Sequence, residues 1–129
     1  YAADYDIATM VRSMSGFGSE FKDPNKVKAI YSPVTGACHF FTRAAVPHDR
    51  DDVERKEWFL HIGVYSYKTQ ALIDYCESPE TYYEQVEKLE QLRAIEHGIS
   101  IGAIQTNTQL MGVDTPEDLK KLEGVLSGT

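Results

Sequence analysis

The chain has 129 residues, of which 42% are hydrophobic and 11% are aromatic, as expected for one globular domain with a core of its own. Its 13 basic and 20 acidic residues give a net charge of -7 at pH 7. This acidic balance argues against nucleic acid or an anionic membrane as the main partner, because both bind basic surfaces.

The first half of the chain predicts strands separated by polar loops. Residues 7–11 form a short strand-like run, and the glycine-containing residues 13–23 predict a mobile loop. Residues 26–31 and 37–42 are strand candidates on either side of a turn with Pro and Gly, which predicts a hairpin. Residues 45–56 carry a proline and a dense run of charges and predict a solvated loop.

The second half predicts alternating strands and helices. Residues 58–67 are apolar at most positions, which favours a central, buried strand. Residues 69–75 predict a helix, and Ser78-Pro79-Glu80 predicts the start of the longest helix. That helix ends at His97-Gly98 and places one apolar stripe on its surface, formed by Tyr82, Val86, Leu89 and Leu92. Residues 99–105 predict another strand. Together these elements favour an α/β architecture with a mixed sheet and flanking helices.

The segment 112–119 combines a helix start with a spare carboxylate. Thr115 can cap a last helix over residues 116–126, and Pro116 fits its first position. Asp114 follows an apolar run and precedes this helix, where the loops of open α/β sheets bind ligands. Its carboxylate suits Mg²⁺, which takes oxygen ligands. The alternative is that Asp114 is an accessory cap.

Several motifs that the sequence lacks limit the functions it can have. Neither GxGxxG nor GxxxxGK[ST] occurs in the sequence, so a nucleotide would need an unconventional phosphate loop or one upstream of Tyr1. The chain begins without an initiator Met, and we expect further sequence before it. No apolar run reaches the length of a membrane span, and Cys38 and Cys76 form no CxxC pair. We therefore expect a cytoplasmic protein without a membrane partner, although the two cysteines could form one bridge.

Three groups of residues could bind a ligand. His61, Gly63 and Tyr65 alternate along one strand face and could donate hydrogen bonds to a polyhydroxylated acid, or they could be core residues. Arg43, at a strand end, can bind a carboxylate or phosphate through two nitrogens, or it can pair within a surface loop.

The third group lies on the predicted long helix. Glu87 and Gln91 are four residues apart and share a face, with Glu90 at its edge. An acid and an amide there could bind sugar hydroxyls. The alternative is a solvated charged face.

Five segments in this order resemble the C-terminal half of the CMP-Kdo synthetase family, the 3-deoxy-manno-octulosonate cytidylyltransferases of lipopolysaccharide assembly. The resemblance runs from about residue 7 to residue 126. The segments that carry it are Asp23-Pro24-Asn25-Lys26-Val27-Lys28, residues 42–51 (TRAAVPHDRD), His61-Ile62-Gly63-Val64-Tyr65-Ser66-Tyr67, Leu89-Glu90-Gln91-Leu92-Arg93 and residues 112–119 (GVDTPEDL).

The resemblance implies a Rossmann-like nucleotidyltransferase fold with a β-hairpin insertion, in which residues 1–129 are the C-terminal part of one domain whose N-terminal half is missing. It also implies a homodimer that joins CTP to a Kdo-like sugar acid with Mg²⁺, giving CMP-sugar and pyrophosphate. Asp114 matches a metal-binding aspartate of the family. The sugar-acid pocket positions are matched by His61, Tyr65, Glu90 and Gln91, and Arg43 is expected to face the sugar carboxylate or the phosphate.

Some residues depart from the family pattern. His48 stands where an aromatic ring is usual, Ser66 replaces a glycine, and Leu110-Met111 precede Gly112 in place of small or polar residues. A non-catalytic sugar-acid-binding or dimerisation module is the second hypothesis, and a cytidylyltransferase for a related amino-sugar acid is the third. The family's triphosphate loop and cytosine pocket lie in its N-terminal half, so we expect residues 1–129 alone to be inactive.

Overall fold

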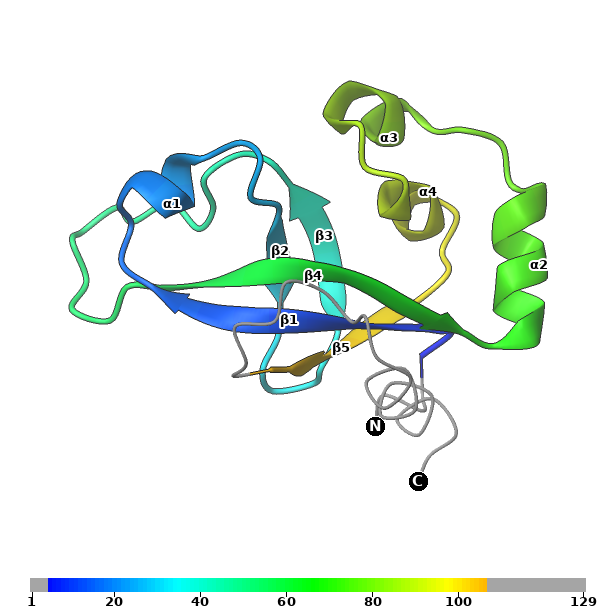
Figure 1. Cartoon of the computed structure of the whole chain (residues 1–129), viewed down its shortest axis with the longest axis horizontal. Coiled ribbons are helices and arrows are strands. Elements are labelled where there is room, and N and C mark those ends of the chain that lie inside the picture. The colour runs from blue at the N-terminus through cyan, green and yellow to red at the C-terminus, as the bar shows by residue number, and fades with distance from the viewer. Residues whose placement is uncertain (1–4, 107–129) are drawn as a thin grey trace.

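Strand β4 (Glu57–Tyr67) runs through the middle of a five-stranded sheet with the order β3-β2-β4-β1-β5 (Figure 1). The computed structural model describes residues 5–106 of the chain. The other strands are β1 (Ile7–Ser15), β2 (Lys28–Tyr31), β3 (Cys38–Thr42) and β5 (Ile101–Gln105). β1 and β5 are parallel and the remaining neighbours are antiparallel, which confirms the predicted mixed sheet and its β2–β3 hairpin.

Helices α2 (Thr69–Glu77) and α4 (Gln91–Glu96) cover one face of the sheet. Ala71 of α2 and Leu92 of α4 belong to the same buried cluster as Ile7 of β1. A smaller cluster lies on the other face, formed by Ala8, Met10, Ile62, Val64 and Ile104. β4 is therefore central, as predicted, but most of its side chains are only partly buried.

The two edges of the sheet meet at one end. Ala37, just before β3, forms an antiparallel bridge with Gly102 of β5. The Ala103 N–H also donates to the Gly36 carbonyl at 2.8 Å. The sheet therefore curls towards a barrel, and this contact shields part of the edge-strand backbone from other chains.

The predicted helix over residues 78–97 is wrong as one element. The chain forms α3 (Tyr82–Glu87), then turns at Lys88, which adopts the left-handed conformation with φ 58° and ψ 46°, and continues as α4. A non-glycine residue there costs about 1–2 kcal/mol. The turn lets Leu89 and Leu92 reach the core, while Tyr82 and Val86 stay exposed at 70% and 61%. Burial of the two leucines offsets the strain.

The end of α4 agrees with the prediction at Gly98. Gly98 has a φ of 78°, which glycine adopts without the steric cost of a Cβ. The Gly98 N–H donates to the Ile95 carbonyl and the Ile99 N–H donates to the Ala94 carbonyl. These two hydrogen bonds form a Schellman motif that ends the helix.

The predicted loop over residues 13–23 is also wrong in part. β1 continues to Ser15 because Met14 and Ser15 pair with the start of β4, and a short helix α1 (Ser19–Lys22) follows. Phe21 of α1 is buried, with its ring centroid 5.6 Å from that of Trp58. The two aromatic residues Phe17 and Phe21 in this segment were the missed signal, since their rings pack together with centroids 4.4 Å apart.

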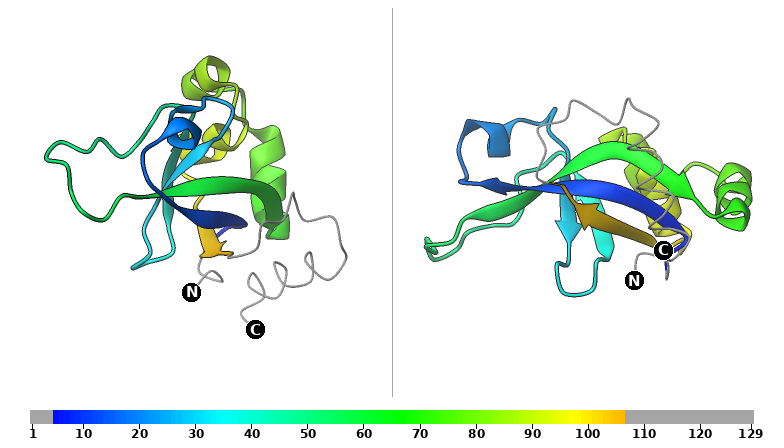
Figure 2. Two further views of the ribbon diagram at one scale, coloured as in Figure 1. Left: turned by 60° about the vertical axis from the view of Figure 1, so that its left-hand side comes forward. Right: turned by 60° about the horizontal axis from the view of Figure 1, so that its bottom comes forward.

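Other expectations can be compared directly. The segment 45–56 contains no helix or strand, and Figure 2 shows this connection between β3 and β4 extending away from the sheet. Cys38 is buried, Cys76 is exposed and both are free thiols. Within residues 5–106, no helix has the length and apolar character needed to cross a membrane. The predicted helix over 116–126 and Asp114 lie outside the described residues.

We predict that Leu92→Ala destabilises the protein by about 2–5 kcal/mol, because the Leu92 side chain of α4 is fully buried in the core and its loss leaves a cavity. Leu72→Ala on α2 is the matched control, since Leu72 is 43% exposed, and it should cost roughly 0.5 kcal/mol or little more. Urea denaturation measures both values. Equal losses for the two variants would contradict the placement of α4 on the core.

Candidate functional site

A cavity of about 260 Å³ lies where β4, α2 and the α3–α4 connection meet. The residues around it are Tyr65, Tyr67, Tyr75, Lys88, Leu89, Glu90 and Gln91. Three of the five predicted substrate-binding residues, Tyr65, Glu90 and Gln91, therefore meet in one place although they come from different elements. The cavity combines aromatic rings with a carboxylate, an amide and an ammonium group, a set of groups suited to a polar ligand with an apolar face.

Three tyrosines form the aromatic wall. Tyr65 and Tyr67 lie two residues apart on β4 and share a face, with ring centroids 6.0 Å apart. The Tyr75 ring of α2 lies 6.1 Å from that of Tyr67. Burial is the main cause that raises the pKa of all three phenols. Their hydroxyl groups are therefore neutral at physiological pH, and those of Tyr65 and Tyr67 can donate hydrogen bonds to ligand oxygens.

His61 lies next to this wall rather than in it. Its ring centroid is 5.5 Å from that of Tyr65 and 4.7 Å from that of Phe41. Its Nε2 is 3.0 Å from the Thr9 hydroxyl oxygen, and Thr9 donates its single hydroxyl proton to the Val64 carbonyl at 2.7 Å. The Thr9 oxygen then accepts from Nε2–H, which leaves Nδ1 of neutral His61 as an acceptor.

Burial lowers the pKa of His61 to about 4. The imidazole is therefore uncharged at neutral pH and serves as a hydrogen-bonding group, not as a cation for an anionic ligand. The sequence left open whether His61 is a core residue or binds a ligand, and the second interpretation stays a prediction. His61 is packed against core residues and still keeps one ring nitrogen without a partner among the described residues.

Glu90 and Gln91 begin α4 at the rim of the cavity. Glu90 is the exposed N-cap residue of the helix, and Gln91 is partly buried. A carboxylate accepts hydrogen bonds and an amide both donates and accepts, so the pair can bind neighbouring hydroxyl groups of a sugar. The turn at Lys88 places them there, which an unbroken helix would not do.

Lys88, Tyr67, Tyr75 and Leu89 also line the cavity and were missed as site residues. Lys88 is exposed, and it makes none of the ion pairs found among residues 5–106. It supplies the local positive charge that an acidic protein needs to bind an anion. The alternation of Tyr65 and Tyr67 was a readable signal for Tyr67, whereas the position of Lys88 depends on a turn that the sequence pattern does not reveal.

Arg43 does not line this cavity. Its guanidinium donates to the carbonyls of Pro24, Glu87 and Lys88, at 3.1, 2.7 and 3.3 Å from Nη1, Nε and Nη2. Two of these carbonyls are at the C-terminal end of α3, where helices leave carbonyls without partners. Arg43 thus anchors the connection that carries Lys88, and its contact with a substrate stays a prediction.

Glu87 completes this anchor. Its carboxylate accepts hydrogen bonds from the Thr42 hydroxyl at 2.5 Å and from the Arg43 N–H at 2.9 Å. The interpretation of Glu87 as part of a solvated charged face is therefore wrong. Thr42 ends β3, so this contact ties the end of a strand to the end of α3.

Among residues 5–106, no three His, Cys, Asp or Glu side chains gather in a way that could hold a metal ion. The described part of the chain therefore does not form a metal centre of its own. Asp114 lies outside it, so its predicted role as a metal ligand is untested. A larger hollow of about 520 Å³ lies beside the exposed connection 47–57, but none of the predicted site residues lines it.

Comparison with known proteins gives consistent findings. The sequence profile described as "Cytidylyltransferase" matches residues 2–101. The chain is 40% identical over 107 residues to a 3-deoxy-manno-octulosonate cytidylyltransferase of Desulfatibacillum aliphaticivorans, covering 83% of this chain and 43% of the relative. It is 43% identical over 100 residues to the protein of the same name from a Nitratiruptor species, covering 78% and 41% of the two chains.

A solved structure of CMP:2-keto-3-deoxy-manno-octonic acid synthetase in complex with CTP has a similar fold, with a TM-score of 0.75 and 31% sequence identity. The match covers 96% of this chain and 50% of that one. The chain thus spans about half the length of the relatives that it matches.

We predict that His61 makes stability depend on pH. Because the pKa in the folded protein is about 4 and the ordinary value is 6.5, the unfolded chain binds a proton between these values that the folded protein does not bind. The contribution of His61 is therefore complete above about pH 6.5 and is lost as the pH falls towards about 4. Urea denaturation of the wild type and of His61→Gln across this range should show a steeper loss for the wild type. An NMR titration in which His61 is protonated near its ordinary pKa would contradict the assignment.

Proposed function

The chain belongs to the cytidylyltransferase family, and on this basis we propose that it forms the sugar-acid-binding half of an enzyme that joins CTP to 3-deoxy-manno-octulosonate or a closely similar acid. The products are the CMP-sugar and pyrophosphate, and the pathway is lipopolysaccharide biosynthesis. The observation that carries the proposal is the single cavity where Tyr65, Glu90 and Gln91 meet. The names of the relatives supply the substrate class.

The chemistry requires the sugar acid to be held while its anomeric hydroxyl attacks the α-phosphate of CTP. The new bond joins the anomeric oxygen to the α-phosphorus, the hydroxyl proton is released to water, and the bond from that phosphorus to the bridging oxygen breaks as pyrophosphate leaves. The hydroxyls of Tyr65 and Tyr67 can bind the ring hydroxyls together with Gln91 and Glu90, and Nδ1 of His61, beside the cavity, can accept one more hydrogen bond. This fixed orientation is the contribution of the described residues to the rate.

Charge at the phosphates needs a cation, since this chain is acidic overall. We propose Mg²⁺ with Asp114 among its ligands. When bound, the ion would neutralise charge that develops on the phosphates. We also propose a homodimer in the cytoplasm. The exposed apolar residues Tyr82 and Val86 of α3 are consistent with burial of that helix against another copy.

The direct test is pyrophosphate release from CTP by the full-length protein, with 3-deoxy-manno-octulosonate or an amino-sugar acid such as N-acetylneuraminate as acceptor. We expect release with the first acid and little with the second. Release with neither acid would overturn the proposed function. Release only with the amino-sugar acid would overturn the choice of substrate.

His61→Ala should raise the KM for the sugar acid by roughly one decade or more and leave the KM for CTP within about twofold, because the His61 ring lies 5.5 Å from that of Tyr65, which lines the proposed sugar-acid cavity. Steady-state kinetics with each substrate varied in turn measures both values. Thermal denaturation is the control. Equal changes in both KM values together with a large loss of stability would show that His61 is only a packing residue.

Asp114→Asn in the full-length protein should lower turnover by roughly two decades or more, because a positioned metal ion stabilises charge by several kcal/mol. The melting temperature should hardly change, since Thr115 and Pro116 supply the helix start without Asp114. Turnover within a few-fold of the wild type would contradict the metal assignment. A loss of the fold would show that Asp114 is structural.

A further inference from the structure

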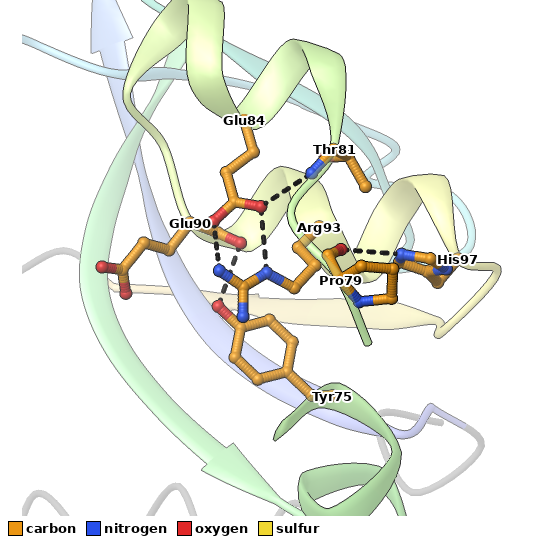
Figure 3. A network of polar contacts seen from close by, with 7 residues as sticks. All are labelled: Tyr75, Pro79, Thr81, Glu84, Glu90, Arg93 and His97. Atoms are coloured by element: carbon orange, nitrogen blue, oxygen red, sulfur yellow. Dashed lines mark hydrogen bonds and ion pairs between the residues drawn. The ribbon is translucent and has the colours of Figure 1, made fainter. Parts of the chain in front are cut away.

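A network of polar contacts joins α2, α3 and α4 beside the cavity, and Figure 3 shows its members. The Tyr75 hydroxyl of α2 donates to the Glu90 carbonyl at 3.1 Å. Figure 3 also shows the Glu90 side chain extending away from the network, so Tyr75 binds the backbone of Glu90 and leaves its carboxylate free. The same carbonyl accepts from the Arg93 N–H at 3.1 Å in the first turn of α4.

Arg93 holds the Tyr75 ring in place. Its guanidinium carbon lies 5.1 Å from the Tyr75 ring centroid, within the range of a cation–π contact. Its Nε and Nη2 donate to the two carboxylate oxygens of Glu84 at 2.9 and 2.6 Å. Glu84 also accepts from the Thr81 N–H at 3.2 Å, which fixes the carboxylate to the start of α3.

This ion pair is partly shielded from water. The Arg93 and Glu84 side chains are 19% and 7% exposed. A bidentate arginine–carboxylate pair has a defined plane, so the guanidinium can present a fixed flat surface to the tyrosine ring. Lysine in place of Arg93 could keep the charge but neither the second hydrogen bond nor the flat surface.

We propose that Tyr75, held by Arg93 and Glu84, is a positioning residue that sets the place of Glu90 and Gln91 at the cavity for the sugar acid. This inference rests on the proposed function. The α3–α4 connection is held from two sides, since Arg43 binds the carbonyls of Glu87 and Lys88 and Tyr75 binds that of Glu90. Removal of one anchor lets the rim move, and small displacements of binding groups have large effects on catalysis.

The role is distinct from direct substrate binding. Arg93 is not among the residues that line the cavity. Any effect of Arg93 on the sugar acid must therefore pass through the residues that it contacts. Tyr75 does line the cavity, so Tyr75 alone cannot separate positioning from contact, and the two residues have to be tested together.

The experiment compares Tyr75→Phe, Arg93→Lys and the double variant in the full-length protein. Tyr75→Phe removes only the hydroxyl that binds the Glu90 carbonyl. We expect each single variant to raise the KM for 3-deoxy-manno-octulosonate roughly five- to tenfold and to change the KM for CTP less than about twofold. The double variant should resemble the single ones, because both changes release the same anchor. Tyr5→Phe is the matched control, since the Tyr5 hydroxyl also donates to a backbone carbonyl, that of Thr35 at 2.9 Å, and Tyr5 does not line the cavity.

A second measurement does not depend on turnover. Hydrogen exchange of the peptide that covers residues 87–92 should become faster in Tyr75→Phe and in Arg93→Lys, but not in Tyr5→Phe. Unchanged exchange in the first two variants would show that Tyr75 and Arg93 do not hold the α3–α4 connection, whether or not the protein is active. If the wild type shows no activity at all, the proposed function fails, and with it the role of Tyr75 in sugar-acid binding. Hydrogen exchange still decides whether Tyr75 and Arg93 hold the α3–α4 connection in place.

In an active protein, two results would overturn the positioning role. One is an unchanged sugar-acid KM in Arg93→Lys, which would make Tyr75 a direct contact at most. The other is an equal rise of both KM values with a lower melting temperature, which would make the network a general support of the fold. Selective and non-additive changes in the sugar-acid KM support the proposal.

Discussion

The short connection between α3 and α4 determines the geometry of the candidate site, and its shape depends on backbone carbonyls that the break at Lys88 leaves without helical partners. Such carbonyls are costly to bury unless a donor reaches them. Arg43 donates to those of Glu87 and Lys88. Tyr75 adds a hydrogen bond to that of Glu90. The site therefore exists because Arg43, just after β3, replaces hydrogen bonds that a continuous helix would have made itself, and Tyr75 of α2 adds one more at the start of α4.

The charged groups around this connection have structural consequences as well as electrostatic ones. The hydrogen bonds from Arg93 lower the pKa of Glu84, and the same contacts raise the pKa of Arg93, so the pair stays ionised across the physiological range. A partly buried ion pair adds little net stability because desolvation opposes the attraction. What it supplies here is a fixed geometry. Lys88, by contrast, is exposed and makes no ion pair within the described residues, which suits a group that meets a ligand.

The sequence predicted the order and type of the strands because alternation and turn residues are local signals. It predicted the hairpin, the central β4 and the end of α4 at Gly98 for the same reason. It missed the break at Lys88, because a lysine does not mark a left-handed turn. The break depends on the packing of Leu89 and Leu92 against core residues that are far away in the sequence. Tyr65, Glu90 and Gln91 were grouped through their resemblance to family motifs, whereas Lys88 and Tyr75 needed the three-dimensional arrangement.

The parallel pairing of β1 with β5 has a consequence for how the protein is made. Asp6 and Ser100, which hydrogen-bond at the start of this pair, are 94 residues apart in the chain. Contacts of such long range form slowly, because the intervening chain must first be ordered. During synthesis from the N-terminus, both edges of β1 stay unpaired until β4 emerges, and the edge that binds β5 stays unpaired until the helices have followed. The residues of the cavity lie within that interval, so a ribosome has to complete nearly all of the described chain before a stable binding site can form.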